Sequence, residues 1–194
     1  MPPKSVRAQW AAHLKKAGGK PAAIPVVIGR KPFQGILLGI DPSLRGTGLA
    51  VLSFSSGTSF RLLRSETVAP PQTADLPACL GHIAAAVERL IQQFQPQAVA
   101  IEETIYVQNF RTAQKLGAAR GAAIGQAAIR GIPVFEYPPL RIKQAAVGYG
   151  RASKEQISRH MSSLLGLVEL LPFDEADAAA AAYCHAMTRG RESG

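Results

Sequence analysis

The order of apolar and polar positions predicts alternating strands and helices from Gly35 onward. Short apolar or alternating runs bounded by Gly, Ser and Pro predict strands, and longer runs with apolar residues three and four positions apart predict helices. The predicted strands span residues 36–41, 49–54, 60–68, 98–102 and 133–137. The predicted helices span residues 76–94, 111–130, 140–147, 154–165 and 175–187. Short turns join the first three strands into an antiparallel meander, so the whole pattern predicts an α/β fold with a mixed sheet covered on both faces.

Charge divides the chain after residue 34. Residues 1–34 contain seven Lys and Arg side chains and no acid, whereas the rest of the chain contains 15 basic and 13 acidic side chains. A basic segment of this kind binds nucleic acid by displacing phosphate counterions, or it is only a solvated tail. We expect a flexible basic arm over residues 1–34, one folded domain over residues 35–188 and a short tail over residues 189–194.

Composition excludes several classes of protein. The 194 residues, 47% of them hydrophobic, suffice for one domain with a sizeable core. No apolar run reaches the roughly 18 residues of a membrane-spanning helix, and no signal-peptide core follows the first basic residues. Cys79 and Cys184 are too few for a disulfide framework, and no Cys/His spacing suggests zinc. We therefore expect a cytoplasmic protein.

Acids are scarce, and four of them stand at informative places. Asp41 and Glu102 each close an apolar strand, so their carboxylates share one edge of the sheet if these strands are parallel neighbours. Asp174 and Asp177 lie three residues apart, on one face of the last predicted helix. Carboxylate oxygens suit Mg²⁺, and paired ions about 3.5–4 Å apart hydrolyse phosphodiesters. Each acid alone is equally explained as a strand-end cap or a helix-dipole partner, and Asp174 as an N-cap.

These acids and the motifs around them resemble the RuvC family of Holliday-junction resolvases. The resemblance covers roughly residues 36–187, with its blocks in family order. The blocks are Gly39–Ser43 with Gly46–Gly48, Ala100–Glu102, Gln114–Gly121, Val134–Tyr137, Ile142–Gln144 with Gly148–Gln156, and Asp174–Ala178.

The resemblance implies a fold, an activity and partners. It implies a ribonuclease-H-like, five-stranded mixed sheet and a homodimer that makes paired symmetric nicks in four-way DNA junctions during recombination and repair. It implies two Mg²⁺ ions per active site, with Mn²⁺ as a substitute, and the RuvA–RuvB branch-migration complex as a partner. It places the catalytic, metal-binding carboxylates at Asp41, Glu102, Asp174 and Asp177, and two functional lysines at Lys143 and Lys154.

The loop after Glu102 departs from the family pattern. The family places an aromatic residue three positions after this glutamate, where this chain has Ile105 and then Tyr106. We expect Tyr106 to stack on an unpaired base, and Arg111 and Lys115 to bind DNA beside it.

Two other features follow from the predicted helices. We expect His185 to be a packed residue and not a ligand. The helix at 111–130 has a face of small residues, which packs on its own sheet or, as we favour, forms the dimer interface. This face comprises Ala113, Gly117, Gly121, Ala122 and Gly125.

Three other functions compete with this interpretation. The segment from Asp41 to Gly48 also resembles the phosphate loop of actin-like ATPases and sugar kinases, but the sequence holds no second domain or adenosine motif. A ribonuclease-H-like nuclease for another substrate has the same fold, because function lies in the site. A non-catalytic DNA-binding module is disfavoured by the presence of all four acids.

Overall fold

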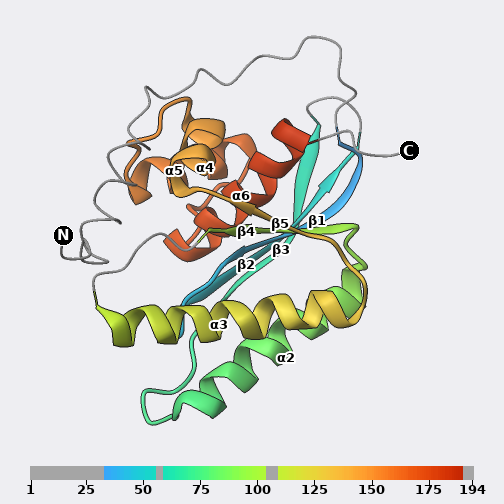
Figure 1. Cartoon of the computed structure of the whole chain (residues 1–194). Coiled ribbons are helices and arrows are strands. Elements are labelled where there is room, and N and C mark those ends of the chain that lie inside the picture. The colour runs from blue at the N-terminus through green and yellow to red at the C-terminus, as the bar shows by residue number, and fades with distance from the viewer. Residues whose placement is uncertain (1–32, 56–58, 104–108, 190–194) are drawn as a thin grey trace, which may run out of the picture. The chain divides into compact units, whose positions relative to one another are not determined.

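The computed structural model describes residues 33–55, 59–103 and 109–189 (Figure 1). The chain divides into two units, Met1–Arg30 and Lys31–Gly194, and the fold below is that of the second unit. The expected basic arm lies almost wholly outside the described residues and stays a prediction. Phe33, at its end, packs edge-on against Phe54, with ring centroids 5.9 Å apart.

Five strands form one mixed sheet, in the order β3-β2-β1-β4-β5. β1 pairs antiparallel with β2, so the predicted meander is confirmed, and it pairs parallel with β4, which meets the condition for the two strand-end acids to share one edge. The strands are β1 (Gly35–Asp41), β2 (Thr47–Phe54), β3 (Phe60–Val68), β4 (Ala98–Glu102) and β5 (Val134–Tyr137).

Helices cover both faces of the sheet, as predicted (Figure 1). α2 (Leu76–Phe94) and α3 (Phe110–Ile129) lie on one face. α4 (Pro139–Val147), α5 (Lys154–Leu164) and α6 (Phe173–Arg189) lie on the other. None of the described helices is long and apolar enough to span a membrane.

The last helix begins two residues before its predicted start at residue 175. α6 begins at Phe173, so Asp174 lies inside its first turn and is not the N-cap. The carbonyl of Pro172 accepts a hydrogen bond from the amide of Ala176 at 2.9 Å, which starts the helical pattern before Asp174.

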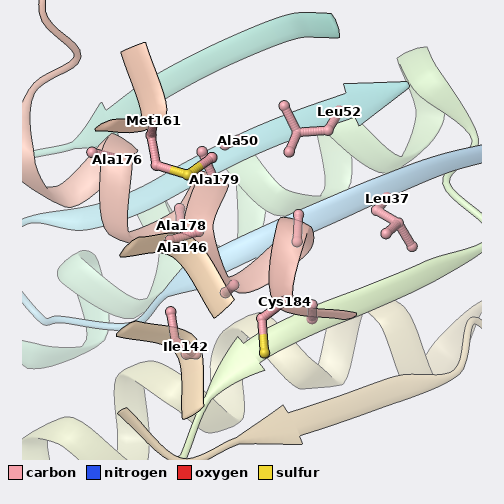
Figure 2. Packing of buried hydrophobic residues seen from close by; sticks show 14 of the residues in the cluster. Leu37, Ala50, Leu52, Ile142, Ala146, Met161, Ala176, Ala178, Ala179 and Cys184 are labelled. Atoms are coloured by element: carbon pink, nitrogen blue, oxygen red, sulfur yellow. The ribbon is translucent and has the colours of Figure 1, made fainter. Parts of the chain in front are cut away.

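The two faces of the sheet are packed with side chains of different size. Large branched residues fill the space under α2 and α3, where Leu38, Ile40 and Leu49 meet Ile83 and Leu90. On the opposite face, the alanines of α6 pack between the strands and the side chains of α4 and α5 (Figure 2). Because Ala178–Ala182 are fully buried, this helix is enclosed on all sides by the sheet, α4 and α5.

Glycines let the backbone of α6 touch the sheet. A Cβ atom on Gly39 of β1 would lie 1.9 Å from the carbonyl oxygen of Ala178. A Cβ atom on Gly48 of β2 would lie 1.9 Å from the carbonyl oxygen of Asp174. Only a residue without a side chain fits at either position, so these two glycines fix the depth at which α6 sits.

Replacing Gly39 by alanine tests this close contact. We expect Gly39→Ala to lower the free energy of unfolding by about 3 kcal/mol or more, because the obstacle is a helix backbone and not a movable side chain. Gly81→Ala is the control, since a Cβ there meets nothing within 4 Å, and it should raise stability by up to about 1 kcal/mol through helix propensity. Urea unfolding of both variants measures this, and equal stabilities would contradict the packing described.

Candidate active site

The strand-end acids face α6 because side chains alternate along a strand. Leu37 of β1 and Ala100 of β4 belong to the apolar cluster under α6, whereas Ile40 and Ile101 belong to the cluster on the other face. The period of two therefore places the side chains of Asp41 and Glu102 on the α6 side. Ile40 pairs with Ile101 in the parallel register, so the two acids follow at the same edge of the sheet.

The first turn of α6 brings two more carboxylates to this edge. Its backbone lies over Gly48, which pairs with Asp41 across the β1–β2 ladder. A Cβ atom on Gly46 would lie 3.0 Å from Oδ2 of Asp174, so this aspartate reaches the turn that follows Asp41. Asp177, one turn further along α6, is only 8% exposed. The described structure thus gathers the four predicted carboxylates from two strands and one helix.

A capping box sets the position of Lys154. The Ser153 hydroxyl accepts a hydrogen bond from the Gln156 amide at 3.3 Å, and the Gln156 side chain accepts one from the Ser153 amide at 2.9 Å. α5 therefore begins at Lys154. Its ammonium Nζ lies 3.5 Å from Oδ1 of Asp174 and 3.3 Å from Oδ2 of Asp177.

Buried serines tie α5 to the segment that leads into α6. The Ser158 hydroxyl donates to the carbonyl of Leu171 at 2.6 Å, and the Ser162 hydroxyl accepts from the amide of Leu171 at 2.9 Å. Both serines are almost fully buried, so water does not compete for these bonds. This network holds the start of α6 beside α5 and so keeps Lys154 within reach of Asp174 and Asp177.

Burial and like charge raise the pKa values of the clustered acids. The pKa of Asp41 rises from 3.8 to about 7, mainly through burial and then through the charges of Glu102 and Asp177. The pKa values of Glu102 and Asp177 are also raised, again mainly by burial. Carboxylates with raised pKa values in one cluster are typical of functional sites.

Two lysines oppose this excess of negative charge. Burial acts to lower the pKa of Lys154, but the charge of Asp177 and its hydrogen bond outweigh it, so the pKa of Lys154 is raised. The charge of Lys143, in α4, acts to lower the pKa values of Glu102 and Asp177. The structure therefore places both predicted lysines close to the predicted carboxylates.

Comparison with known proteins places this site in a family. The family model described as crossover junction endodeoxyribonuclease RuvC matches residues 37–185. This chain belongs to the RuvC family. It is 42% identical over 154 residues to the RuvC of Alkaliphilus oremlandii, which covers 79% of this chain and 93% of that relative. It is 45% identical over 150 residues to the RuvC of Burkholderia thailandensis, covering 77% of this chain and 82% of the relative.

Solved RuvC structures share the fold of this chain. Thermus thermophilus RuvC in complex with a Holliday junction substrate superposes with a TM-score of 0.74 at 35% identity, covering 79% of this chain and 94% of that chain. The yeast mitochondrial Holliday junction resolvase Ydc2 superposes with a TM-score of 0.56 at 13% identity, which shows a common fold alone. The predicted ribonuclease-H-like architecture is thereby confirmed.

The four carboxylates suit a hard divalent cation in their chemistry and their charge. All offer oxygen ligands, which Mg²⁺ and Mn²⁺ prefer. The pKa of Asp41 is raised first by burial and then by the charges of the other acids, and a dication would neutralise that negative charge. As placed, no three Asp, Glu, His or Cys side chains of the described residues converge closely enough to hold one ion. Instead the Lys154 ammonium pairs with Asp174 and Asp177, so ion binding requires side-chain rotations here.

Other predicted residues lie apart from the RuvC carboxylates. Ile105 and Tyr106 fall outside the described residues, so the stacking role of Tyr106 stays a prediction. Arg111 and Lys115 are exposed on α3, on the sheet face opposite to α6, and the structure does not bring them to the cluster. His185 is packed, as predicted: it is buried, with Nδ1 2.9 Å from the Tyr137 hydroxyl.

Sequence reasoning missed one contact at this site. Glu175, between the two aspartates, accepts hydrogen bonds from hydroxyls of Ser65 and Thr67 on β3. The signal was a pair of polar residues at alternate positions of β3, on the face that otherwise buries apolar side chains. Their partner lies 110 and 108 positions further along the chain, so sequence spacing did not reveal it.

The raised pKa of Asp41 predicts a pH-dependent cost in stability. The folded state keeps a proton up to about pH 7 that the unfolded state releases near pH 3.8, so stability falls as pH rises between these values. Asp41→Asn removes this loss: with a chelator present, we expect the variant to match the wild type near pH 4 and exceed it by up to about 4 kcal/mol at pH 8.

Urea unfolding across pH 4–8 measures the difference. Glu103→Gln is the control, because Glu103 is exposed directly after β4, and its gap from the wild type should stay constant with pH. A pH-independent gap for Asp41→Asn would contradict the charge crowding described above.

Proposed function

We infer that this chain is a crossover junction endodeoxyribonuclease, which cuts four-way DNA junctions as a Holliday-junction resolvase. One observation carries this proposal: a chain of the RuvC family brings Asp41, Glu102, Asp174 and Asp177 together at one edge of its sheet, with a lysine between two of them. A non-catalytic DNA-binding module has no need of this partly buried, mutually repelling set of acids.

We propose that the four carboxylates hold two divalent ions, Mg²⁺ or its substitute Mn²⁺. Bound there, such ions would supply activation of a water molecule and stabilisation of the leaving oxygen of the cut phosphodiester. Asp41 is the candidate for a ligand shared by both ions, because its carboxylate feels the charges of the three other acids. Burial of Asp41 and Asp177 keeps competing water away from their oxygens.

Lys154 and Lys143 place positive charge beside the carboxylates, where we expect the DNA strand to bind. Lys154 neutralises Asp174 and Asp177 in the arrangement described here. We propose that once ions occupy the carboxylates, the ammonium groups of Lys154 and Lys143 turn to phosphate oxygens beside the cut bond, since Lys is a strong partner for phosphate. Such contacts orient the strand and carry no sequence information.

Asp41→Asn tests the assignment of the active site. The amide keeps the shape but not the charge, so we expect cleavage of a synthetic four-way junction to fall by at least about 10³-fold, while junction binding without divalent ions is kept or tightened. Glu103→Gln, one residue beyond β4, should cut normally. Cleavage by Asp41→Asn at the wild-type rate would overturn the assignment, and equal cutting of linear duplex or RNA–DNA hybrid by the wild type would point to a different nuclease.

We propose that the chain acts as a homodimer through α3. The buried alanines of α3, Ala119, Ala123 and Ala127, face the body of the protein. Its outward side carries Phe110, 73% exposed, and Gly117 and Gly121, whose added Cβ atoms would meet nothing within 4 Å. This outward side of α3, the strip, is open and uncharged, so α3 of a second copy could pack against it. A twofold dimer of this kind would place two active sites on the opposed strands of a junction. Association with the RuvA–RuvB complex is the further partnership that we propose from the family.

A charged residue on the strip tests the dimer. We expect Gly121→Arg to convert a dimer to a monomer in light scattering and to abolish paired nicking, because a guanidinium would be buried between two helices. Gly81→Arg, at an equally open position of α2, should leave the dimer intact. A dimeric Gly121→Arg protein would exclude this face as the interface.

A further inference from the structure

Glu175 makes an unusual pair of contacts beside the proposed active site. Oε2 of its carboxylate accepts a hydrogen bond from the Ser65 hydroxyl at 2.5 Å, and Oε1 accepts one from the Thr67 hydroxyl at 3.3 Å. Both carboxylate oxygens are thus held by the same strand, β3, which carries none of the proposed catalytic acids.

The register of the sheet explains why the two hydroxyls converge. Ser65 pairs with Ala50 and Thr67 with Gly48, and these positions of β2 lie under α6. Glu66, between them, points to the opposite face and pairs with Arg89 of α2. The period of two therefore aims two hydroxyls, and no charge, at the first turn of α6.

These contacts fix the rotation of that turn about its own axis. An α-helix turns by about 100° per residue, so Asp174 and Asp177 point in similar directions and Glu175 points well away from both. Contact with Gly48 sets the distance between this turn and the sheet at Asp174. That distance by itself does not determine the rotation of the turn about the helix axis. A side chain held at both oxygens on the neighbouring strand removes this freedom.

We propose that Glu175 is a positioning residue: by its two hydrogen bonds to β3 it holds the first turn of α6 so that Asp174 and Asp177 face Asp41. The proposal rests on the proposed function, in which those three aspartates bind the ions. Glu175 acts through the helix and not on the substrate, so it is not a catalytic residue. Groups that orient metal ligands typically change metal affinity or activity by about 10- to 100-fold.

The experiment removes the contact from each side. We compare Glu175→Ala with the double variant Ser65→Ala/Thr67→Val, which keeps the glutamate but removes both donors, and with the triple variant. Each should lower kcat for junction cleavage and raise the Mg²⁺ concentration that gives the half-maximal rate by about 10-fold. Junction binding, measured with a chelator present, should stay within about twofold of the wild type. The triple variant should be no worse than either parent, because both parents lose one shared interaction.

Controls separate this role from others. Glu169→Ala removes an exposed acid from the segment before α6 and should change nothing. Glu175→Gln keeps one acceptor and should fall between the wild type and Glu175→Ala. If Glu175→Ala loses cleavage while Ser65→Ala/Thr67→Val cuts normally, Glu175 is itself a ligand and the proposal fails. It fails equally if both variants cut normally while Asp41→Asn is inactive, whereas an active Asp41→Asn would refute the proposed active site instead.

The thermal shift on adding Mg²⁺ provides a readout without cleavage. The shift should shrink in Glu175→Ala and in the double variant, and both should keep the wild-type circular dichroism spectrum. A full Mg²⁺-induced shift in the two variants would overturn the positioning role, whatever their folding stability.

Discussion

The backbone of α6 touches the sheet at two glycines, and the rest of the site depends on this contact. Gly39 and Gly48 admit carbonyl oxygens of α6 to positions where any side chain would collide with them. Fully buried alanines continue the close approach along the helix and let α4 and α5 pack on its other side. As a result, acids at the start of α6 meet acids at the ends of β1 and β4 without any long side chain bridging the gap.

The clustered carboxylates repel each other, and the packing around α6 keeps them together. Burial, and after it the repulsion between the four carboxylates at this edge, raises the pKa of Asp41 to about 7. α6 cannot move away from the sheet to relieve this repulsion. The glycine contacts, the hydrogen bonds of buried serines to Leu171 and the bonds from β3 to Glu175 hold it in place. The repulsion is met instead by mobile charge: Lys154 on α5, and in the proposed reaction divalent ions. In the proposed reaction, Asp174 and Asp177 would exchange the Lys154 ammonium for divalent ions after rotation of their side chains.

Much of this could be predicted from the sequence, because the decisive signals are local. Asp41 and Glu102 each end a run of apolar residues, and a shared sheet edge was predicted on the condition that those runs are parallel neighbours, which they are. The last helix begins two residues before its predicted start at residue 175, so the alternative explanation of Asp174 as an N-cap fails. The helix start depends on Pro172 and on buried serines of α5, which no short-range pattern reveals. The hydrogen bonds to Glu175 were missed for the same reason. Their donors, Ser65 and Thr67, lie on β3, which comes next to the first turn of α6 only when the chain folds.

The two faces of the sheet are packed differently, and the difference bears on where the acids lie. On the α2 and α3 face, large residues such as Leu38, Ile83 and Leu90 bury much apolar area per residue. On the α6 face, alanine and glycine contribute less per residue but bring backbones close. A larger residue at Gly39 or Gly48 would push α6 off the sheet and move Asp174 and Asp177 away from Asp41. The small residues of the α6 face therefore provide proximity, while large residues around them, such as Leu52, Ile142 and Met161, still bury apolar area.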